Sequence, residues 1–190
     1  MDVDEFARFL NSDERKKWQD PLKITGEIGV ESGMTVADLA CGPGYFTIPL
    51  ASLVGEDGLV YAVDANPTML RHLRANIKKS AVHRNTIRVI RADVSKTGIA
   101  AGSVDVAIFA NVLHDLDDKG AFLREVRRIS RRGATVVDID WKKVRTDNGP
   151  PFGIRLAEAE SRRILTGDGF VFTRSIEAGP HHYGLVFNPA

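Results

Sequence analysis

Apolar residues recur along the chain in short β-branched runs that alternate with stretches of helical periodicity. The run over 104–112 is almost entirely apolar, which is typical of a strand buried on both faces. The repeated order of strand, helix and strand favours right-handed crossovers and a doubly wound, Rossmann-like α/β sheet. The predicted strands are 34–40, 59–65, 86–93, 104–112 and 134–141, and the predicted helices are 45–54, 67–80, 118–131 and 155–169.

The two ends of the chain follow different patterns. Residues 4–18 are predicted to be helical, in one piece or in two with Asn11 or Ser12 capping the second, and residues 22–30 form another short helix. The last two apolar runs, 170–178 and 182–188, are joined by a turn that is too short for a crossover, so they must be antiparallel. We expect a seven-stranded, mostly parallel sheet with an antiparallel last strand. The chain is predicted to form a single domain over 1–190, in which a helical cap over 1–33 covers an α/β core over 34–190.

Composition narrows the possible partners and location. The formal net charge of the 190 residues is +1, which gives no electrostatic argument for a nucleic-acid partner. Cys41 is the only cysteine, so an intramolecular disulfide and a multi-cysteine metal site are excluded, and a reducing, cytoplasmic location is expected. No apolar stretch reaches the roughly 18 residues that a membrane span needs.

A glycine-containing loop follows the first predicted strand in "VADLACGPGYFTIPL", residues 36–50. Gly44 is followed by Tyr45 and Phe46, whereas a P-loop needs Lys and then Ser or Thr, so a P-loop is excluded. A dinucleotide-binding loop that began at Gly42 would need a third glycine where Thr47 stands. The loop alone therefore indicates only a tight turn beside a bound ligand.

Three consecutive strands end in an acidic residue: Asp38, Asp64 and Asp93. Asp64 lies about 20 residues after Gly44, a spacing at which a carboxylate can accept hydrogen bonds from ribose hydroxyls. Three carboxylates would repel a pyrophosphate. They suit a cofactor that carries an ammonium group, a sulfonium, a ribose diol and an adenine amino group.

With these motifs the chain resembles the class I S-adenosylmethionine-dependent methyltransferases. The segments "VADLACGPG", "VYAVDAN", "RADV" and "VDVAIFANVLHDLDD" carry the resemblance, which covers about residues 34–187. The family usually has glycine where Ala40 stands; an extra methyl group fits there if φ is negative. The resemblance implies S-adenosyl-L-methionine as cofactor, S-adenosyl-L-homocysteine as product, and a cofactor site formed by Asp38, Ala40, Gly42, Gly44, Asp64, Ala65, Asp93, Val94 and Asn111.

The segments "WQDPLKI", "NVLHDLDD" and "GPHHYGLVF" resemble the small-molecule methyltransferases of ubiquinone and menaquinone biosynthesis. That resemblance implies a small-molecule acceptor and leaves the oligomeric state open. His114, after the fourth strand, is a candidate general base, or else a loop-capping or packing residue. His181 and His182 lie on the same edge if the first strand of the final pair runs parallel to the sheet, and they could bind substrate, shuttle a proton or remain exposed turn residues.

Two further segments are candidates to cover the acceptor. Residues 140–153 are polar and rich in Pro and Gly, which is typical of a lid. Arg15 and Trp18 could face the acceptor, or belong to a solvated helix face with a tryptophan anchor. No spacing of His, Cys, Asp or Glu indicates a metal site. Two other functions stay open: an NAD-dependent oxidoreductase on the same sheet, and a catalytically silent cofactor-binding partner subunit.

Overall fold

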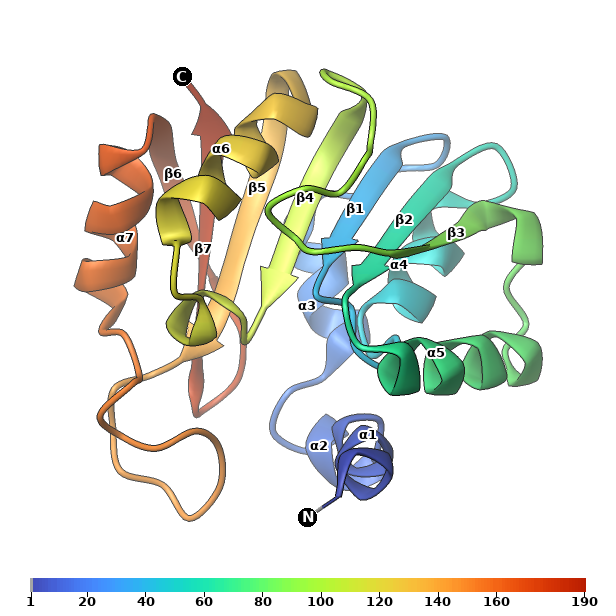
Figure 1. The fold of residues 1–190 in the computed structure, drawn as a ribbon, viewed down its shortest axis with the longest axis horizontal. Helices are drawn as coiled ribbons and strands as arrows, with labels where there is room; N and C mark the ends of the chain where they lie inside the picture. Colours follow the sequence, from blue (N-terminus) through green and yellow to red (C-terminus); the bar gives the residue numbers. More distant parts are fainter. Residues whose placement is uncertain (1) are drawn as a thin grey trace.

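The computed structural model describes residues 2–190 and contains one seven-stranded sheet in the order β3-β2-β1-β4-β5-β7-β6 (Figure 1). All neighbouring strands are parallel except β7, which is antiparallel to both β5 and β6. The predicted α/β class, the strand number and the mostly parallel arrangement are confirmed. The strands are β1 (Thr35–Leu39), β2 (Leu59–Asp64), β3 (Ile87–Arg91), β4 (Val104–Ala110), β5 (Ser130–Trp141), β6 (Phe170–Glu177) and β7 (His182–Pro189).

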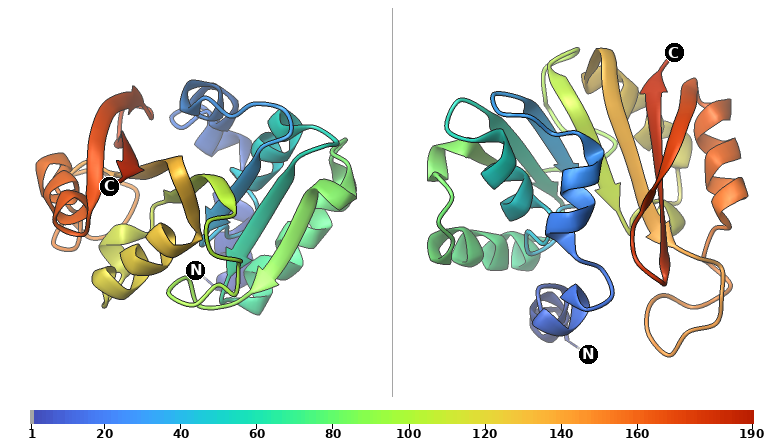
Figure 2. Two further views of the ribbon diagram at one scale, coloured as in Figure 1. Left: turned by 90° about the horizontal axis from the view of Figure 1, so that it is seen from above. Right: turned by 180° about the vertical axis from the view of Figure 1, so that it is seen from behind.

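Helices cover both faces of the sheet, as the two views of Figure 2 show. One apolar cluster packs α3 (Pro21–Ile28), α4 (Thr47–Val54) and α5 (Pro67–Lys79) against one face. A second cluster packs α6 (Lys119–Ile129) and α7 (Glu158–Gly167) against the other. Because both faces are covered, the central strands are apolar throughout, which explains the unbroken run of β4.

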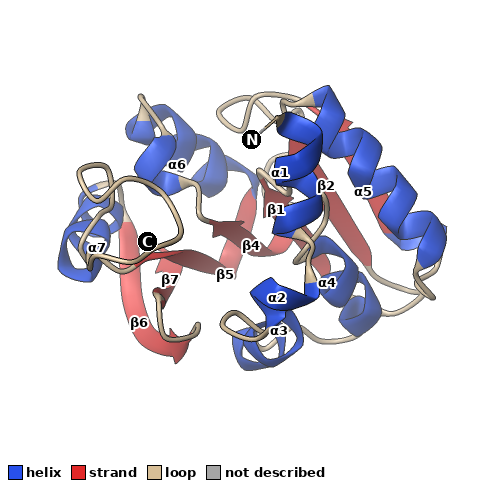
Figure 3. Cartoon of the chain, turned by 90° about the horizontal axis from the view of Figure 1, so that it is seen from below, coloured by secondary structure: helices blue, strands red, loops and turns tan. Residues whose placement is uncertain are grey.

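The switch point of the sheet lies between β1 and β4. From β1 the chain builds outward through β2 and β3, and then returns to the other side of β1 with β4. In open α/β sheets ligands bind at the carboxyl ends of the strands at this point. Figure 3 looks onto this edge, where the short helices α1 (Val3–Leu10) and α2 (Asp13–Lys16) lie on one side of the ends of β4 and β5 and the loop over 142–157 lies on the other.

The final hairpin places its turn at the same edge. Since β7 is antiparallel to β5 and to β6, β6 runs in the direction of β5. Because β6 runs parallel to the sheet, His181 and His182 lie at the carboxyl edge. They lie beside the end of β5, where Trp141 pairs with His182, the first residue of β7.

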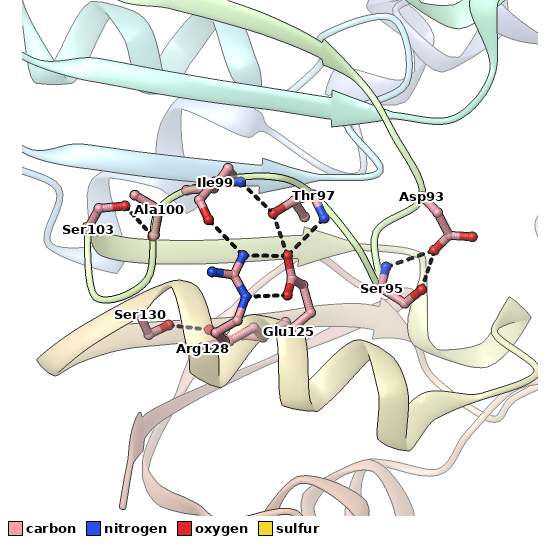
Figure 4. A network of polar contacts seen from close by, with 10 residues as sticks. Asp93, Ser95, Thr97, Ile99, Ala100, Ser103, Glu125, Arg128 and Ser130 are labelled. Carbon is pink, nitrogen blue, oxygen red and sulfur yellow. Dashed lines mark hydrogen bonds and ion pairs between the residues drawn. The ribbon is translucent and has the colours of Figure 1, made fainter.

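The connection from β3 to β4 contains no helix, so the regular alternation is broken here. A charged side chain organises it instead: Glu125 of α6 accepts hydrogen bonds from the backbone and hydroxyl of Thr97, at 2.8 and 2.6 Å (Figure 4). Arg128 bonds the same carboxylate and the carbonyl of Ile99. The hydrogen bonds from Arg128, followed by those from Thr97, outweigh burial and lower the pKa of Glu125 to about 2. The carboxylate stays ionised and fixes the connection.

Several predicted boundaries differ from the structure. The predicted helix over 155–169 begins only at Glu158, and β5 begins at Ser130 instead of residue 134. Gly133 lies inside β5 with a φ of 78°, where the pairing with β4 is irregular. The predicted two-piece helix near the start is confirmed, with Ser12 capping α2. Within residues 2–190 no helix is long and apolar enough to cross a membrane.

Candidate functional site

A cavity of about 880 Å³ opens at the carboxyl edge of the sheet. Its size is in the range of small-molecule sites. Backbone and side chains from the ends of β1, β2, β4 and β5 line it, together with α1, α2 and the loop over 142–157. Of the residues predicted from the sequence, it brings together Arg15, Trp18, Asp38, Ala40, Gly42, Asp64, Asn111 and His114.

Asp38 lies at the end of β1 and is only 2% exposed. Its Oδ2 accepts a hydrogen bond of 2.5 Å from the hydroxyl of Thr47, the first residue of α4. Burial, helped by the charge of Asp64, raises the pKa of Asp38 to about 7, although Thr47 and Arg15 act in the opposite direction. A cationic ligand group would therefore find a carboxyl group that ionises near neutral pH.

The affinity for S-adenosylhomocysteine is expected to increase as the pH is raised through about 7. Below that pH, binding of the ligand's ammonium group must first remove the proton that burial keeps on Asp38. Calorimetric titrations between about pH 5.5 and 7.5 measure this slope. Asp38→Asn should weaken binding and flatten the slope, and 5′-methylthioadenosine, which has no ammonium group, should show none. An unchanged slope in the Asn variant contradicts this role for Asp38.

Asp64 lies at the end of β2, and both of its oxygens hold the backbone beside the cavity. Oδ2 accepts from the N–H of Gly42 at 2.9 Å, and Oδ1 accepts from the N–H of Asn66 at 2.8 Å. Asn66 then caps α5 with its own side chain, and Pro67 begins that helix. Each carboxylate oxygen has a second acceptor position, so Asp64 can fix the loop and still accept hydrogen bonds from a diol.

The loop after β1 has left-handed backbone at Ala40, with a φ of 59°. The methyl group of Ala40 fits easily only if φ is negative, so this residue is strained. Gly42 and Gly44 also have positive φ. A Cβ on Gly44 would come within 2.4 Å of Leu73 of α5, so this glycine allows close packing and does not line the cavity. Ala40 is thus the one strained non-glycine residue of this loop.

Ala40→Gly is expected to raise the free energy of unfolding by about 1 kcal/mol, because glycine adopts positive φ without the clash of a Cβ. Urea denaturation measures the change. Ala75→Gly, in the exposed middle of α5, is the matched control and should lower the same quantity by about 1 kcal/mol. Destabilisation of both variants would show that the backbone at position 40 carries no strain.

Asp93, Val94 and Ala65 do not line the cavity. Asp93 is exposed, and its Oδ1 accepts from the backbone and hydroxyl of Ser95, toward which Figure 4 shows it turned. These two hydrogen bonds lower the pKa of Asp93. The adenine role that the family resemblance implies for Asp93 and Val94 stays a prediction.

His114 follows β4 in a single 3-10 turn and is buried at the cavity wall. Its Nδ1 lies 2.6 Å from Oδ1 of Asp140, and its backbone N–H donates to Oδ2 of the same carboxylate at 3.2 Å. Its Nε2 lies 3.4 Å from the exposed Asp115. Burial lowers the pKa of His114, but the hydrogen bond to Asp140 and the charges of Asp140 and Asp115 outweigh it, and the net pKa is raised above 6.5.

Asp140 was not anticipated from the sequence as a site residue. It lies near the end of β5, fully buried, and shares a face of the strand with Asp138 two residues earlier. Burial, followed by the charge of Asp140, raises the pKa of Asp138 well above its usual range, and its Oδ2 accepts a hydrogen bond from the hydroxyl of Ser161. Two acids inside an otherwise apolar strand, "VVDIDW", are the signal that could have identified the pair.

Asn111 also has left-handed backbone, with a φ of 61°, at the end of β4. Its N–H donates to the carbonyl of Ile139 at 2.7 Å, which holds the β4 terminus against β5. Its side-chain Oδ1 is buried without a hydrogen-bond partner among residues 2–190. Because Asn111 lines the cavity, this orphaned acceptor is available to a ligand N–H or O–H.

The two histidines of the last turn lie behind the cavity wall. His182 is buried between Trp18 and Trp141, with ring centroids 5.5 and 4.2 Å away, and neither of its ring nitrogens has a partner in the described chain. Burial lowers its pKa to about 3, so it is neutral. His181 lines a smaller cavity of about 310 Å³, which is also lined by Trp18 and Trp141. Neither histidine reaches the large cavity.

The loop over 142–157 is organised by Arg155, whose buried guanidinium donates to the carbonyls of Val144, Asn148 and Pro150 and to the hydroxyl of Thr146. The same guanidinium lies 5.0 Å from the centre of the Trp141 ring. Loop residues from Asp147 to Pro151, and Ile154, form one wall of the large cavity. The segment predicted as a lid thus lies over the site with its own internal framework.

The comparisons with known proteins agree with this geometry. A family model described as a methyltransferase domain matches residues 37–137. A demethylmenaquinone methyltransferase of Desulfitobacterium hafniense is 29% identical over 67% of this chain and 49% of that protein. A ubiquinone/menaquinone biosynthesis C-methyltransferase of Idiomarina loihiensis is 30% identical over 60% of this chain and 45% of that protein. The chain spans about half the length of the curated relatives it matches.

A solved structure of a SAM-dependent methyltransferase from Aquifex aeolicus superposes on all of this chain and all of its own, with a TM-score of 0.92 and 30% identity. The family match covers the loop after β1, the end of β2, all of β4 and the first part of β5, whereas α1, α2, the end of β5 and the loop over 142–157 lie outside it. The chain therefore belongs to the methyltransferase domain family, that of the class I S-adenosylmethionine-dependent methyltransferases.

Proposed function

We propose that the chain transfers a methyl group from S-adenosylmethionine to a small, largely apolar acceptor with an ionisable hydroxyl group, and that His114 is the general base. The observation that carries this proposal is the His114–Asp140 pair at the wall of the cavity. A buried carboxylate that holds one ring nitrogen leaves the other nitrogen to take a proton.

The residues that line the cavity fit the cofactor. Asp64 has free acceptor positions for the ribose hydroxyls, Asp38 offers a carboxyl group for the ammonium group, and the orphaned oxygen of Asn111 awaits a donor. When bound, the cofactor supplies an electrophilic methyl group on a sulfonium. Because attack on such a group mainly needs an aligned nucleophile, the protein contributes position, exclusion of water and removal of the acceptor's proton.

One wall of the cavity that His114 lines is largely apolar, and it indicates the chemical class of the acceptor. Most of this wall is apolar or aromatic and comes from α1, α2, the end of β5 and the loop over 142–157. If His114 takes the proton of a ring hydroxyl group, the adjacent ring carbon becomes nucleophilic. After that carbon has taken the methyl group, its own hydrogen leaves as a proton and the hydroxyl group is regenerated. The curated relatives, named for demethylmenaquinone and for ubiquinone/menaquinone biosynthesis, support a hydroxylated aromatic ring and methylation at carbon. Leu116, Trp18, Trp141, Phe6, Phe9 and Ile154 belong to this wall.

A two-step experiment tests the proposal. Calorimetric titration should first show binding of both S-adenosylmethionine and S-adenosylhomocysteine, and the absence of binding at millimolar concentration contradicts the cofactor site. Formation of S-adenosylhomocysteine is then followed with hydroxynaphthalenes and hydroquinones, and with carboxylic acids and amines as controls. Turnover of amines or acids alone contradicts the acceptor class, and binding without any turnover favours a silent partner subunit.

A further inference from the structure

A buried arginine lines the cavity without a counter-ion in the described chain, and the proposed acceptor chemistry does not use its charge. Arg15 of α2 is 5% exposed and lines the cavity. Its Nε and Nη2 donate to Oε1 of Gln19 at 3.0 and 2.8 Å, and its Nη1 donates to the carbonyl of Leu10 at 2.8 Å. A guanidinium has five N–H donors, so two are left. Within residues 2–190 Arg15 has no ion pair.

The surroundings of Arg15 hold it rigidly but do not neutralise it. The guanidinium carbon lies 3.9 Å from the centre of the Tyr45 ring, and the Tyr45 hydroxyl donates to the carbonyl of Gln19. The side-chain amide nitrogen of Gln19 is itself buried without a partner. Unused donors of a cation and of an amide are therefore buried side by side, and burying such groups without acceptors is costly. Burial lowers the pKa of Arg15 to about 10, so it remains charged.

The position of Arg15 in the cavity indicates which anion belongs there. Arg15 lies close enough to Asp38 for each charge to affect the other's pKa. If Asp64 binds the ribose, Asp38 and Arg15, which line the same cavity, are left for the amino-acid part of the cofactor. That part carries one ammonium group and one carboxylate. The carboxyl of Asp38 suits the first, and the planar fork of Arg15 suits the second.

We propose that Arg15 binds the carboxylate of the methionine moiety of S-adenosylmethionine, and that α2 is thereby part of the cofactor site. This inference rests on the cofactor site proposed above and replaces the acceptor-facing role that the sequence suggests for Arg15. This role also explains the contacts around the guanidinium, because Gln19 and Tyr45 hold the guanidinium of Arg15 in place before the ligand binds. A Cβ on Gly179 would come within 2.0 Å of the carbonyl of Trp18, so the final hairpin packs tightly on the same segment.

The test compares two ligands that differ only in the carboxylate: S-adenosylmethionine and its decarboxylated form. The native protein should bind the complete cofactor about 10- to 100-fold more tightly, as expected for charge-assisted hydrogen bonds to one carboxylate. In Arg15→Gln this preference should fall below about threefold, mostly through loss of affinity for the complete cofactor. Arg15→Lys, which keeps the charge without the fork, should retain an intermediate preference, and Arg8→Gln, on the exposed side of α1, should retain all of it.

If Arg15 has a purely structural role, Arg15→Gln loosens α2 and lowers the affinity for both ligands by the same factor. Equal weakening in Arg15→Gln therefore overturns the proposal. A native protein that binds both ligands equally also overturns it, whether or not the variants fold, and thermal unfolding checks their folding. If the native protein binds neither ligand, the cofactor site itself fails, which is distinguishable from failure of the Arg15 assignment alone.

Discussion

Replacement of His114 by alanine is expected to lower kcat by about 10²- to 10⁴-fold, the usual contribution of a general base. The affinity for S-adenosylhomocysteine should change less than about threefold, because the proposed cofactor contacts of Asp38 and Asp64 do not involve His114. Single-turnover kinetics with the best acceptor, together with calorimetry, separates the two quantities. A variant that keeps more than about a tenth of the native kcat contradicts the assignment of His114 as base.

The pH profile gives a second measurement of the same role. Because the pKa of His114 is raised above 6.5, activity should fall as the pH is lowered through that raised pKa. Asp140→Asn removes the negative charge, which raises this pKa directly and strengthens the hydrogen bond to His114, and leaves the burial that lowers it. The acid limb of kcat/KM should then move to lower pH while the maximal rate falls. Asp115→Asn, at the exposed contact of 3.4 Å, is the control and should move the limb much less.

Replacement of Asp64 by alanine is expected to weaken binding of S-adenosylhomocysteine by about 100-fold, since hydrogen bonds from two hydroxyls to one carboxylate would be lost. Asp64 also holds the N–H groups of Gly42 and Asn66, so the loop after β1 loosens at the same time. Calorimetry with the 2′,3′-dideoxy analogue separates these effects. Loosening of the loop weakens binding of both the analogue and the complete ligand. Loss of the contact between Asp64 and the ribose hydroxyls weakens binding of the complete ligand alone.

Asp57→Ala, in the turn before β2, serves as the control and should leave the affinity for both ligands unchanged. If Asp64→Ala weakens S-adenosylhomocysteine and the dideoxy analogue by the same factor, the carboxylate acts only on the loop. The ribose assignment would then be wrong, although the strand-end position of Asp64 would stand.

The sheet was predictable from the sequence because the central strands are buried on both faces and their apolar runs are short and well separated. The acids near the ends of β1 and β2 were found by their spacing. The predicted boundaries failed where tertiary contacts override local pattern. Gly133, for example, precedes the predicted strand over 134–141 but lies inside β5, where the pairing with β4 is irregular.

The parts of the site that could not be predicted depend on contacts between distant segments. His114 and Asp140 are 26 residues apart, and they meet only because β4 and β5 are parallel neighbours. The backbone angle of Ala40 is invisible in the sequence, because alanine favours negative φ and the loop imposes the opposite sign. Arg15 is similar: its residue type suggests a solvated helix face, and only the packing of α2 on Tyr45 removes it from water.

The framework of Arg155 has a consequence for how new acceptor specificities could arise. Three of the acceptors that Arg155 bonds are backbone carbonyls, which every amino acid provides. Side chains between Val144 and Ile154 can therefore be exchanged without disturbing the path of the loop, provided that Arg155, the hydroxyl of Thr146 and Gly149, which packs closely on Trp141, are kept. Variant libraries confined to this loop would therefore change the side chains that line the acceptor side of the cavity, while the ends of β1 and β2 stay the same.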